Sequence, residues 1–144
     1  MEKREIRFRA WDYDLETMFY PGEFDLAQEK DNGFHAYTYD QDGDFIELEL
    51  MQWTGLADKN GTPIYEGDIL REPPRFKWDK ENYVSYEVFW HSNDMCQKNV
   101  GWQCNRAHFH GSIAGTTKFF NMVPKHTSKL IVIGNIHELE NPIT

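Results

Sequence analysis

The sequence has few of the features that mark secreted or membrane proteins. Its 144 residues include only two cysteines, and no long run of apolar residues occurs. The N-terminal segment MEKREIRFRAW shows no secretory signal, and no segment is apolar enough to span a membrane. We therefore expect a cytoplasmic protein whose two thiols are reduced.

Positive charge is also scarce. Fifteen Lys and Arg residues stand against 24 Asp and Glu residues, which gives a formal net charge of -9. Because contacts to phosphate need a cationic surface, this balance argues against general nucleic-acid binding. A basic partner and mimicry of nucleic acid stay open, and the simplest reading is that the charge keeps the protein soluble.

Helix-forming runs of Ala, Leu, Glu and Lys are nearly absent, whereas aromatic residues are plentiful. The chain has 10 Phe, 7 Tyr and 5 Trp, and with Val and Ile these favour strands. Many short strands and turns without crossover helices predict an antiparallel all-β fold with little helix. We expect an N-terminal β subdomain at residues 1–53 and a small SH3-like β-barrel at residues 54–144.

Alternation of apolar and polar residues predicts half-buried strands at residues 6–10 and 45–52. In the first of these, Arg7 and Arg9 are expected on the polar face. Residues 23–30 are expected to form one or two helical turns.

The last predicted strand, residues 130–133, is strongly apolar. Because sheet edges must be covered, charged or paired, we place it in the middle of the second sheet. Gly134 is expected to form a kink or bulge, with residues 136–139 continuing the strand.

Asp40, Asp42 and Asp44 form a loop that superficially resembles a calcium site. An EF-hand loop needs Gly at its sixth position and Glu at its twelfth, and counting from Asp40 these positions hold Phe45 and Met51. We therefore interpret the loop as an acidic hairpin turn.

The segment MQWTGLADKNGTPIYEGDILR, residues 51–71, holds three turn signals and two short apolar pieces. Asn60 and Gly61 both tolerate positive φ, which makes them a strong turn signal. Gly67 predicts a second sharp change of direction. We expect both glycines to be critical for the backbone of these turns.

This segment resembles the central signature of the YopX-like family of phage and prophage proteins, TGL-x-D-x-NG-x-x-IYEGDI. Residues 8–12, FRAWD, resemble the opening of the family, and residues 132–138, VIGNIHE, resemble its closing VIGNI-x-E. The matches span nearly the whole chain in the right order. The resemblance implies a small, mainly β phage protein of unassigned activity in the host cytoplasm, and it carries over no catalytic residues.

Four residues in or beside the signature are candidate binding residues: Trp53, Tyr65, Glu66 and Asp68. Glu66 and Asp68 straddle Gly67, as paired carboxylates do in some active sites, where acid–base work needs unequal environments for the two groups. In the simpler interpretation, Asp68 accepts backbone donors in the turn and Glu66 is solvated.

The tryptophans suggest a groove for a peptide or a base. They are Trp11, Trp53, Trp78, Trp90 and Trp102. Aromatic rings that stack bases usually lie beside Lys and Arg, and only one tight basic cluster surrounds a Trp here. We expect most of them in the core and one or two at an interface between subunits.

Candidate zinc ligands are His91, Cys96, Cys104, His108 and His110. A Cys–His nucleophile, Cys104 with His108 or His110, is a further candidate. The spacing Cys-x7-Cys is not that of a zinc knuckle. A Cys–His nucleophile needs a third orienting group, and none lies at a telling spacing. We expect free thiols, surface histidines, and no cofactor or tightly bound metal.

Two functional classes remain. The first is a non-enzymatic phage accessory protein, a β-rich module that self-associates or binds a host or phage protein. The second is a small enzyme or ligand-binding protein with an acidic site around Glu66 and Asp68. We favour the first and expect a homo-oligomer, most simply a two-fold dimer, because so small a chain has few ways to bury its aromatic residues.

Overall fold

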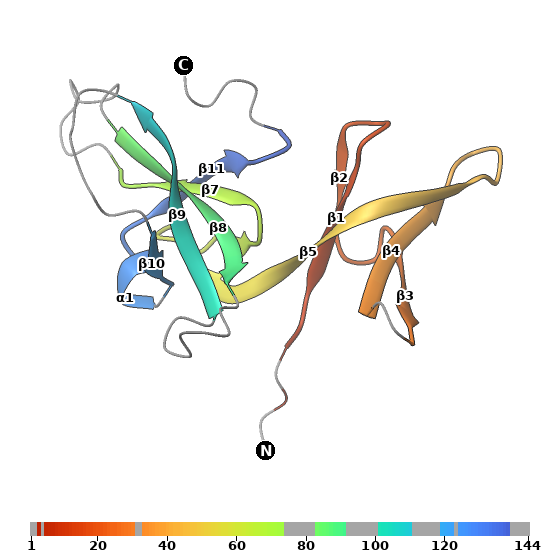
Figure 1. The fold of residues 1–144 in the computed structure, drawn as a ribbon, viewed down its shortest axis with the longest axis horizontal. Helices are drawn as coiled ribbons and strands as arrows, with labels where there is room; N and C mark the ends of the chain where they lie inside the picture. The colour runs from red at the N-terminus through yellow and green to blue at the C-terminus, as the bar shows by residue number, and fades with distance from the viewer. Residues whose placement is uncertain are drawn as a thin grey trace. The chain divides into compact units, whose positions relative to one another are not determined.

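The computed structural model describes residues 3, 5–30, 33–73, 83–91, 101–110, 119–122 and 124–138, with the backbone alone at 83, 84, 91, 101, 103–110, 119–121 and 126. The chain divides into two compact units, Met1–Trp53 and Thr54–Thr144, each with its own core (Figure 1). The described strand pairings are antiparallel, which confirms the all-β prediction.

Helix contributes little to the described residues. The one helix found there, α1 (Pro124–Thr127), is four residues long. Over the same residues, no helix has the length and apolar character needed to cross a membrane.

The first unit is built on five strands of a six-stranded sheet, in the order β2-β1-β5-β4-β3, and the end of β5 continues into the second unit. Its strands are β1 (Phe8–Asp12), β2 (Thr17–Phe19), β3 (Asp25–Glu29), β4 (Gly33–Tyr39) and β5 (Phe45–Ala57). Strand β5 is the longest and pairs with both β1 and β4. Among the described residues, β2 pairs with β1 and β3 pairs with β4, and these two strands end the order.

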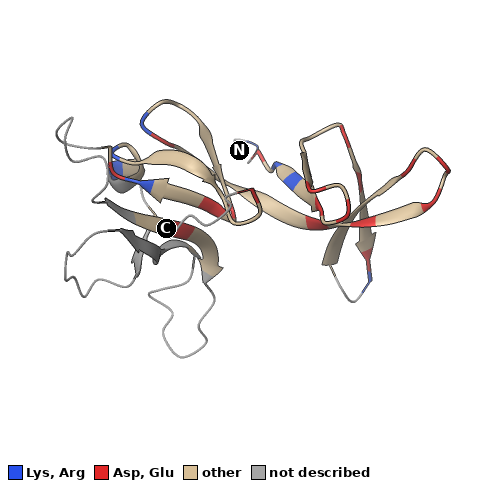
Figure 2. Cartoon of the chain, turned by 90° about the horizontal axis from the view of Figure 1, so that it is seen from above, with Lys and Arg blue, Asp and Glu red and all other residues tan. Residues whose placement is uncertain are grey.

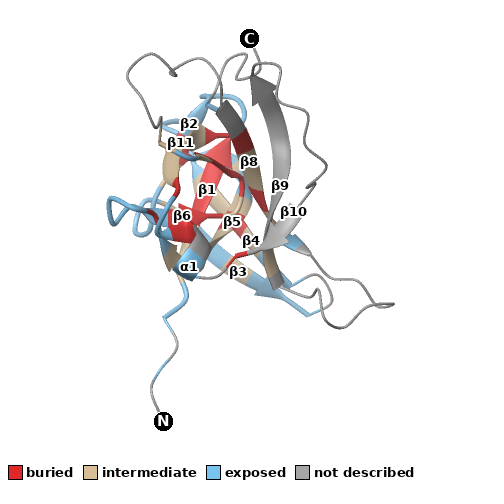
Figure 3. Ribbon diagram, turned by 90° about the vertical axis from the view of Figure 1, so that its left-hand side faces the viewer, coloured by how far each residue is buried: buried red, intermediate tan, exposed pale blue. Residues whose placement is uncertain are grey.

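Strand β1 is buried on both faces (Figure 3). On one face Ala10 is fully buried in a cluster with Ala36 and Leu48, and on the other Trp11 is buried with neighbours from β2 and β5. Arg9 was expected on a polar face, and that expectation is wrong, because only 4% of Arg9 is exposed. Arg9 lies on the same face as Trp11, and side chains of β2 and β5 bury that face as well.

The helical turns expected at residues 23–30 are also wrong. Residues Asp25–Glu29 form β3, which pairs with β4 from Asp25 opposite Tyr37 to Glu29 opposite Gly33. Five consecutive paired positions outweigh the weak local helix preference of this segment, because strand formation depends on context more than on propensity.

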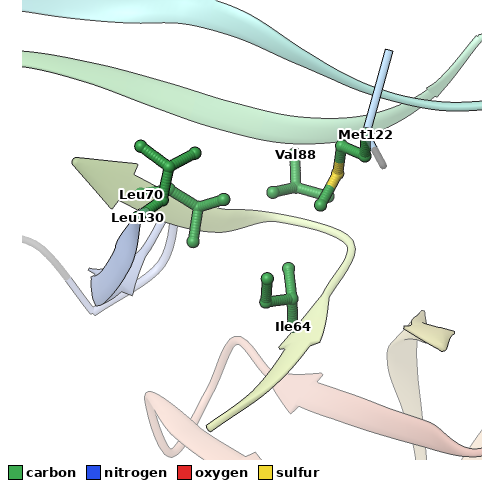
Figure 4. Close-up of a cluster of buried hydrophobic side chains, with 5 residues drawn as sticks. All are labelled: Ile64, Leu70, Val88, Met122 and Leu130. Carbon is green, nitrogen blue, oxygen red and sulfur yellow. The ribbon is translucent and has the colours of Figure 1, made fainter. Parts of the chain in front are cut away.

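The second unit contains a five-stranded sheet with the order β10-β9-β8-β7-β11. Its strands are β7 (Asp68–Arg71), β8 (Tyr83–His91), β9 (Gly101–His110), β10 (Phe119–Asn121) and β11 (Ile131–Asn135). A further short strand, β6 (Pro63–Tyr65), pairs with β5. The core consists of five apolar side chains from β6, β7, β8 and the residues near α1: Ile64, Leu70, Val88, Met122 and Leu130 (Figure 4).

Strand β11 lies at one end of the order and pairs with β7, so its predicted place in the middle of the sheet is wrong. The bulge expected at Gly134 is present, because the register with β7 shifts between Val132 and Gly134. Residues 136–138 form a turn and do not continue the strand. Among the described residues no pairing joins β10 to β11, so the sheet is not seen to close into a barrel.

Candidate functional site

The central signature builds a turn around the carboxylate of Asp58, which is 7% exposed. Its Oδ1 accepts hydrogen bonds from the backbone N–H groups of Asn60 and Thr62, both at 2.8 Å. Its Oδ2 accepts the N–H of Val132, 74 residues further along the chain, at 2.9 Å. One carboxylate therefore shapes the turn and also binds β11, which lies near the end of the sequence of this unit.

The same turn covers the outer edge of β11. Besides the bond to Val132, the N–H of Lys59 donates to the carbonyl of Leu130 at 2.8 Å. An end strand otherwise presents unpaired backbone groups on which another chain can add. Here the signature turn supplies partners for two of these groups, the N–H of Val132 and the carbonyl of Leu130, which helps an apolar strand to lie at the end of the sheet.

The two glycines of the signature have left-handed φ angles, 83° at Gly61 and 86° at Gly67. The N–H of Gly67 donates to the carbonyl of Val88, and its carbonyl accepts the N–H of Ile136, both at 2.9 Å. The Gly67 turn thus connects β8 with the segment after β11.

Asp68 is 1% exposed, and its Oδ2 accepts the backbone N–H of Tyr65 at 2.7 Å. Tyr65 is itself buried, and Glu66 between them is partly exposed. Trp53 belongs to the first unit, where its ring centroid lies 4.7 Å from Cζ of Arg7. The geometry places Asp68 in a turn-capping position and does not assemble the four candidate binding residues into one described site.

The candidate zinc and nucleophile residues fall largely outside what the structure describes. Cys96 lies outside the described residues, and for His91, Cys104, His108 and His110 only the backbone is described. Among the described residues, no group of three or more His, Cys, Asp or Glu side chains is placed to hold a metal ion.

The tryptophans do not share one environment. Trp11 is buried and Trp90 is half exposed, with its ring 5.0 Å from that of Trp102 in an edge-on arrangement. Trp78 lies outside the described residues. No common groove of tryptophans is seen among the four that are described.

A different set of aromatic side chains lies on the β4–β5 hairpin, with Tyr37 partly exposed and Tyr39 and Phe45 exposed. We call these three residues the hairpin aromatic surface. Tyr37 and Phe45 are stacked with their centroids 5.4 Å apart, and Tyr39 meets Phe45 edge-on at 6.0 Å. Tyr39 and Phe45 are 58% and 54% exposed. Large apolar rings gathered at one exposed place are the usual mark of an interaction site.

Strand register places carboxylates on the same face as these rings. Tyr37 lies opposite Asp25 on β3 and opposite Glu47 on β5, and residues directly opposite in antiparallel strands share a face. Both carboxylate residues are exposed. His35, next along this face, has its ring 5.9 Å from that of Tyr37.

The hairpin ends in a loop that is ordered by Asp40. Its Oδ1 accepts the N–H groups of Asp42 and Asp44, both at 2.9 Å, and Gly43 adopts a φ of 82°. This is the acidic hairpin turn that the sequence indicates. Figure 2 shows the acidic residues of this loop in red.

Further along the same face, Glu49 accepts the hydroxyl proton of Tyr13 in a side-chain hydrogen bond. This bond, with a smaller effect of burial, raises the pKa of Tyr13 above its usual 10.0. The hydrogen bond from Tyr13 holds Glu49 in place beside the ring-bearing part of β5.

Sequence reasoning did not select the hairpin aromatic surface. Its signal was present, since Tyr37 and Tyr39 alternate along one strand and Phe45 follows directly after the Asp-rich loop. Alternation shows that the three rings share a face, but it does not show whether that face is covered.

Comparison with known proteins gives a family match and a fold match. The family model described as YopX protein matches residues 7–143. Among solved structures, protein EF1440 from Enterococcus faecalis is similar, with a TM-score of 0.59 and 21% identity over 94% of this chain and 96% of that chain. At this identity the likeness shows a common fold alone. No curated protein matches the chain.

Proposed function

The chain belongs to the YopX protein family, and from this premise we propose that it is a non-enzymatic interaction module that binds a protein of its host or of a phage. The family resemblance implies a phage protein that acts in the host cytoplasm, and we include both in the proposal. The SH3-like closure of residues 54–144 is a finer part of the same proposal, supported by the strand content of that unit.

The carboxylates of the signature support a structural role for this segment. Asp58 accepts three backbone N–H groups, and buried Asp68 accepts one. A general acid or base must reach a substrate proton. Asp68, the buried member of the candidate pair, instead accepts a backbone N–H, which disfavours the alternative of an acidic catalytic site around Glu66 and Asp68.

The observation that carries the proposal is the hairpin aromatic surface. Two of its three rings expose more than half of their surface. Aromatic residues dominate the centres of protein interfaces because they combine large area with few rotatable bonds. Cross-strand ring contacts would also stabilise the hairpin, but stabilisation alone does not require rings this exposed.

A capture experiment with matched variants tests the proposal. The tagged chain, a Tyr39→Ser/Phe45→Ser variant and a Leu15→Ser/Tyr20→Ser control would each be incubated with host lysate. Leu15 and Tyr20 are also exposed, at 64% and 45%, and lie outside the hairpin. We expect one partner to be retained by the wild type and the control and lost by the hairpin variant.

The captured partner would then be purified and titrated against the same three proteins. A dissociation constant that is unchanged in the hairpin variant would contradict the assignment of this surface. Turnover of a small molecule that depends on Asp68 would contradict the non-enzymatic proposal.

A further inference from the structure

The segment that bears the hairpin aromatic surface has an unusual charge pattern. Between Lys30 and Lys59 the sequence contains no Lys or Arg, although it contains seven Asp and Glu residues: Asp31, Asp40, Asp42, Asp44, Glu47, Glu49 and Asp58. Figure 2 shows the charged residues of the β4–β5 hairpin in the colour of acidic side chains. The segment that carries the rings therefore supplies carboxylates and no Lys or Arg.

Rings beside carboxylates form a good environment for a cation. The face of an aromatic ring attracts Arg and Lys groups within about 6 Å of its centroid. Tyr37 has Asp25 on one side and Glu47 on the other in the strand register. A cationic side chain placed over these rings would meet a ring face and a carboxylate together.

The chain already uses this combination within its first unit. Arg7 has its guanidinium carbon 4.7 Å from the ring centroid of Trp53, and its Nη2 lies 2.7 Å from Oε1 of Glu5. That arrangement holds one Arg between a ring and a carboxylate. The hairpin aromatic surface offers the rings and the carboxylates without a cation of its own segment.

Charge also decides between possible occupants. A second copy would bring the same acidic segment against this one, so the carboxylates of the two hairpins would repel. A nucleic acid would bring phosphates to a protein with a net charge of -9. A segment rich in Arg or Lys is attracted by the charge and by the rings.

This inference rests on the proposed function and names the class of its partner. We propose that the hairpin aromatic surface binds a cationic segment of a partner protein, whose Arg or Lys side chains stack on Tyr37, Tyr39 and Phe45 while Asp25 and Glu47 neutralise their charge.

The test is a binding titration with a synthetic probe. The probe is a fluorescein-labelled nine-residue peptide of alternating Gly and Arg, and its control carries citrulline, which has the shape of Arg without the charge. At low ionic strength, we expect the wild-type chain to bind the Arg peptide at least about tenfold more tightly than the citrulline peptide. The affinity should fall several-fold in 0.2 M salt, because exposed charge interactions are screened.

Two variants show whether the peptide binds at the hairpin. Tyr39→Ser/Phe45→Ser should weaken binding about tenfold, since each lost cation–ring contact accounts for roughly a factor of two to five. Glu47→Gln should weaken it several-fold. Asp14→Asn removes one exposed carboxylate outside the hairpin and should leave the affinity within about twofold.

Equal affinity for the Arg and citrulline peptides would overturn the inference. An affinity that is the same in the ring variant, in Glu47→Gln and in Asp14→Asn would also overturn it, because the charge would then act without a site. If the partner captured from lysate still depends on the hairpin rings in that case, the proposed function stands and only the class of partner is wrong. If capture of the partner does not depend on the hairpin rings either, the proposed function and the inferred class of partner are both wrong.

Discussion

Side-chain oxygens of a few Asp and Asn residues hold the turns of this chain. Asp12 and Asp40 act locally, because each Oδ1 accepts N–H groups two to four residues later. Asn135 accepts the N–H groups of His137 and Glu138 in the same way. Asp58 differs, since its second oxygen also bonds a strand far along the chain. Its removal should therefore have a larger effect.

We predict that Asp58→Ala lowers the free energy of unfolding by about 3 kcal/mol, because it deprives three backbone N–H groups of a charged acceptor. Chemical denaturation would measure the change. The control is Asp42→Ala, whose side chain is exposed and which should change stability by less than about 0.5 kcal/mol. Equal effects of the two substitutions would contradict the structural role assigned to the Asp58 carboxylate.

Only the local part of the Asp58 interaction can be predicted from the sequence. Asp before Asn-Gly is a known turn signal, in which the carboxylate bonds the backbone two residues on. The bond to Val132 spans 74 residues and has no local signal. Burial of Arg9 was missed for a related reason, because alternation identifies two faces of a strand but not what covers each of them.

At the scale of elements, the turn signals were more informative than the propensities. Asn60, Gly61 and Gly67 indicated where the chain reverses, and both glycines have the positive φ that such turns need. The segment that became β3 carried helix-forming residues, and only its pairing with β4 made it a strand. The position of β11 depended on the Asp58 turn, which takes the place of a neighbouring strand.

Adding a side chain at the two signature glycines should lower the free energy of unfolding by different amounts. Gly61 has open space around a Cβ atom, so Gly61→Ala should lose only the cost of positive φ, about 1 kcal/mol. Gly67 is buried in a turn that bonds β8 and the residues after β11. We expect Gly67→Val to cost about 2 kcal/mol or more. Thermal melts of both variants would check this, and an unchanged melt for Gly67→Val would refute the turn assignment.

At the hairpin, too, neighbouring residues in the sequence predict some features, whereas others depend on how the strands pair. Tyr37 and Tyr39 could be read as one face of a strand, and the Asp40 loop as its turn. The exposure of Tyr39 and Phe45 is seen only in the structure. The position of Asp25 beside Tyr37 follows from the pairing of β3 with β4, where a helix was predicted. Because helical turns were predicted at residues 23–30, the sequence did not indicate that Asp25 lies beside the rings of the hairpin.

At the scale of the whole molecule, the opposite face of the first sheet offers a place for self-association. Leu26 and Phe34 are 41% and 53% exposed, and the ring of Phe34 lies 5.9 Å from that of Phe8. Alternation places Leu26 on the face of buried Ala36, away from Tyr37. This apolar patch carries none of the hairpin carboxylates. Like-charge repulsion therefore opposes self-association through this patch less than self-association through the hairpin aromatic surface.

We predict a two-fold dimer that uses this patch. Size-exclusion chromatography with light scattering should give twice the mass of one chain at micromolar concentration. Leu26→Ser/Phe34→Ser should give the mass of one chain, and Tyr39→Ser/Phe45→Ser should leave the dimer intact. A single-chain mass for the wild type over the micromolar range would show that the predicted homo-oligomer is wrong.

The bond between Asp58 and Val132 also sets an order of events during synthesis. The signature turn leaves the ribosome well before β11, and until residue 132 follows, the Asp58 carboxylate lacks one of its three donors. Strand β7 lacks its β11 partner over the same interval. Contacts this distant in sequence form late and slow folding. A chain that stopped before residue 131 would therefore carry the whole signature and still present an open sheet edge to other chains.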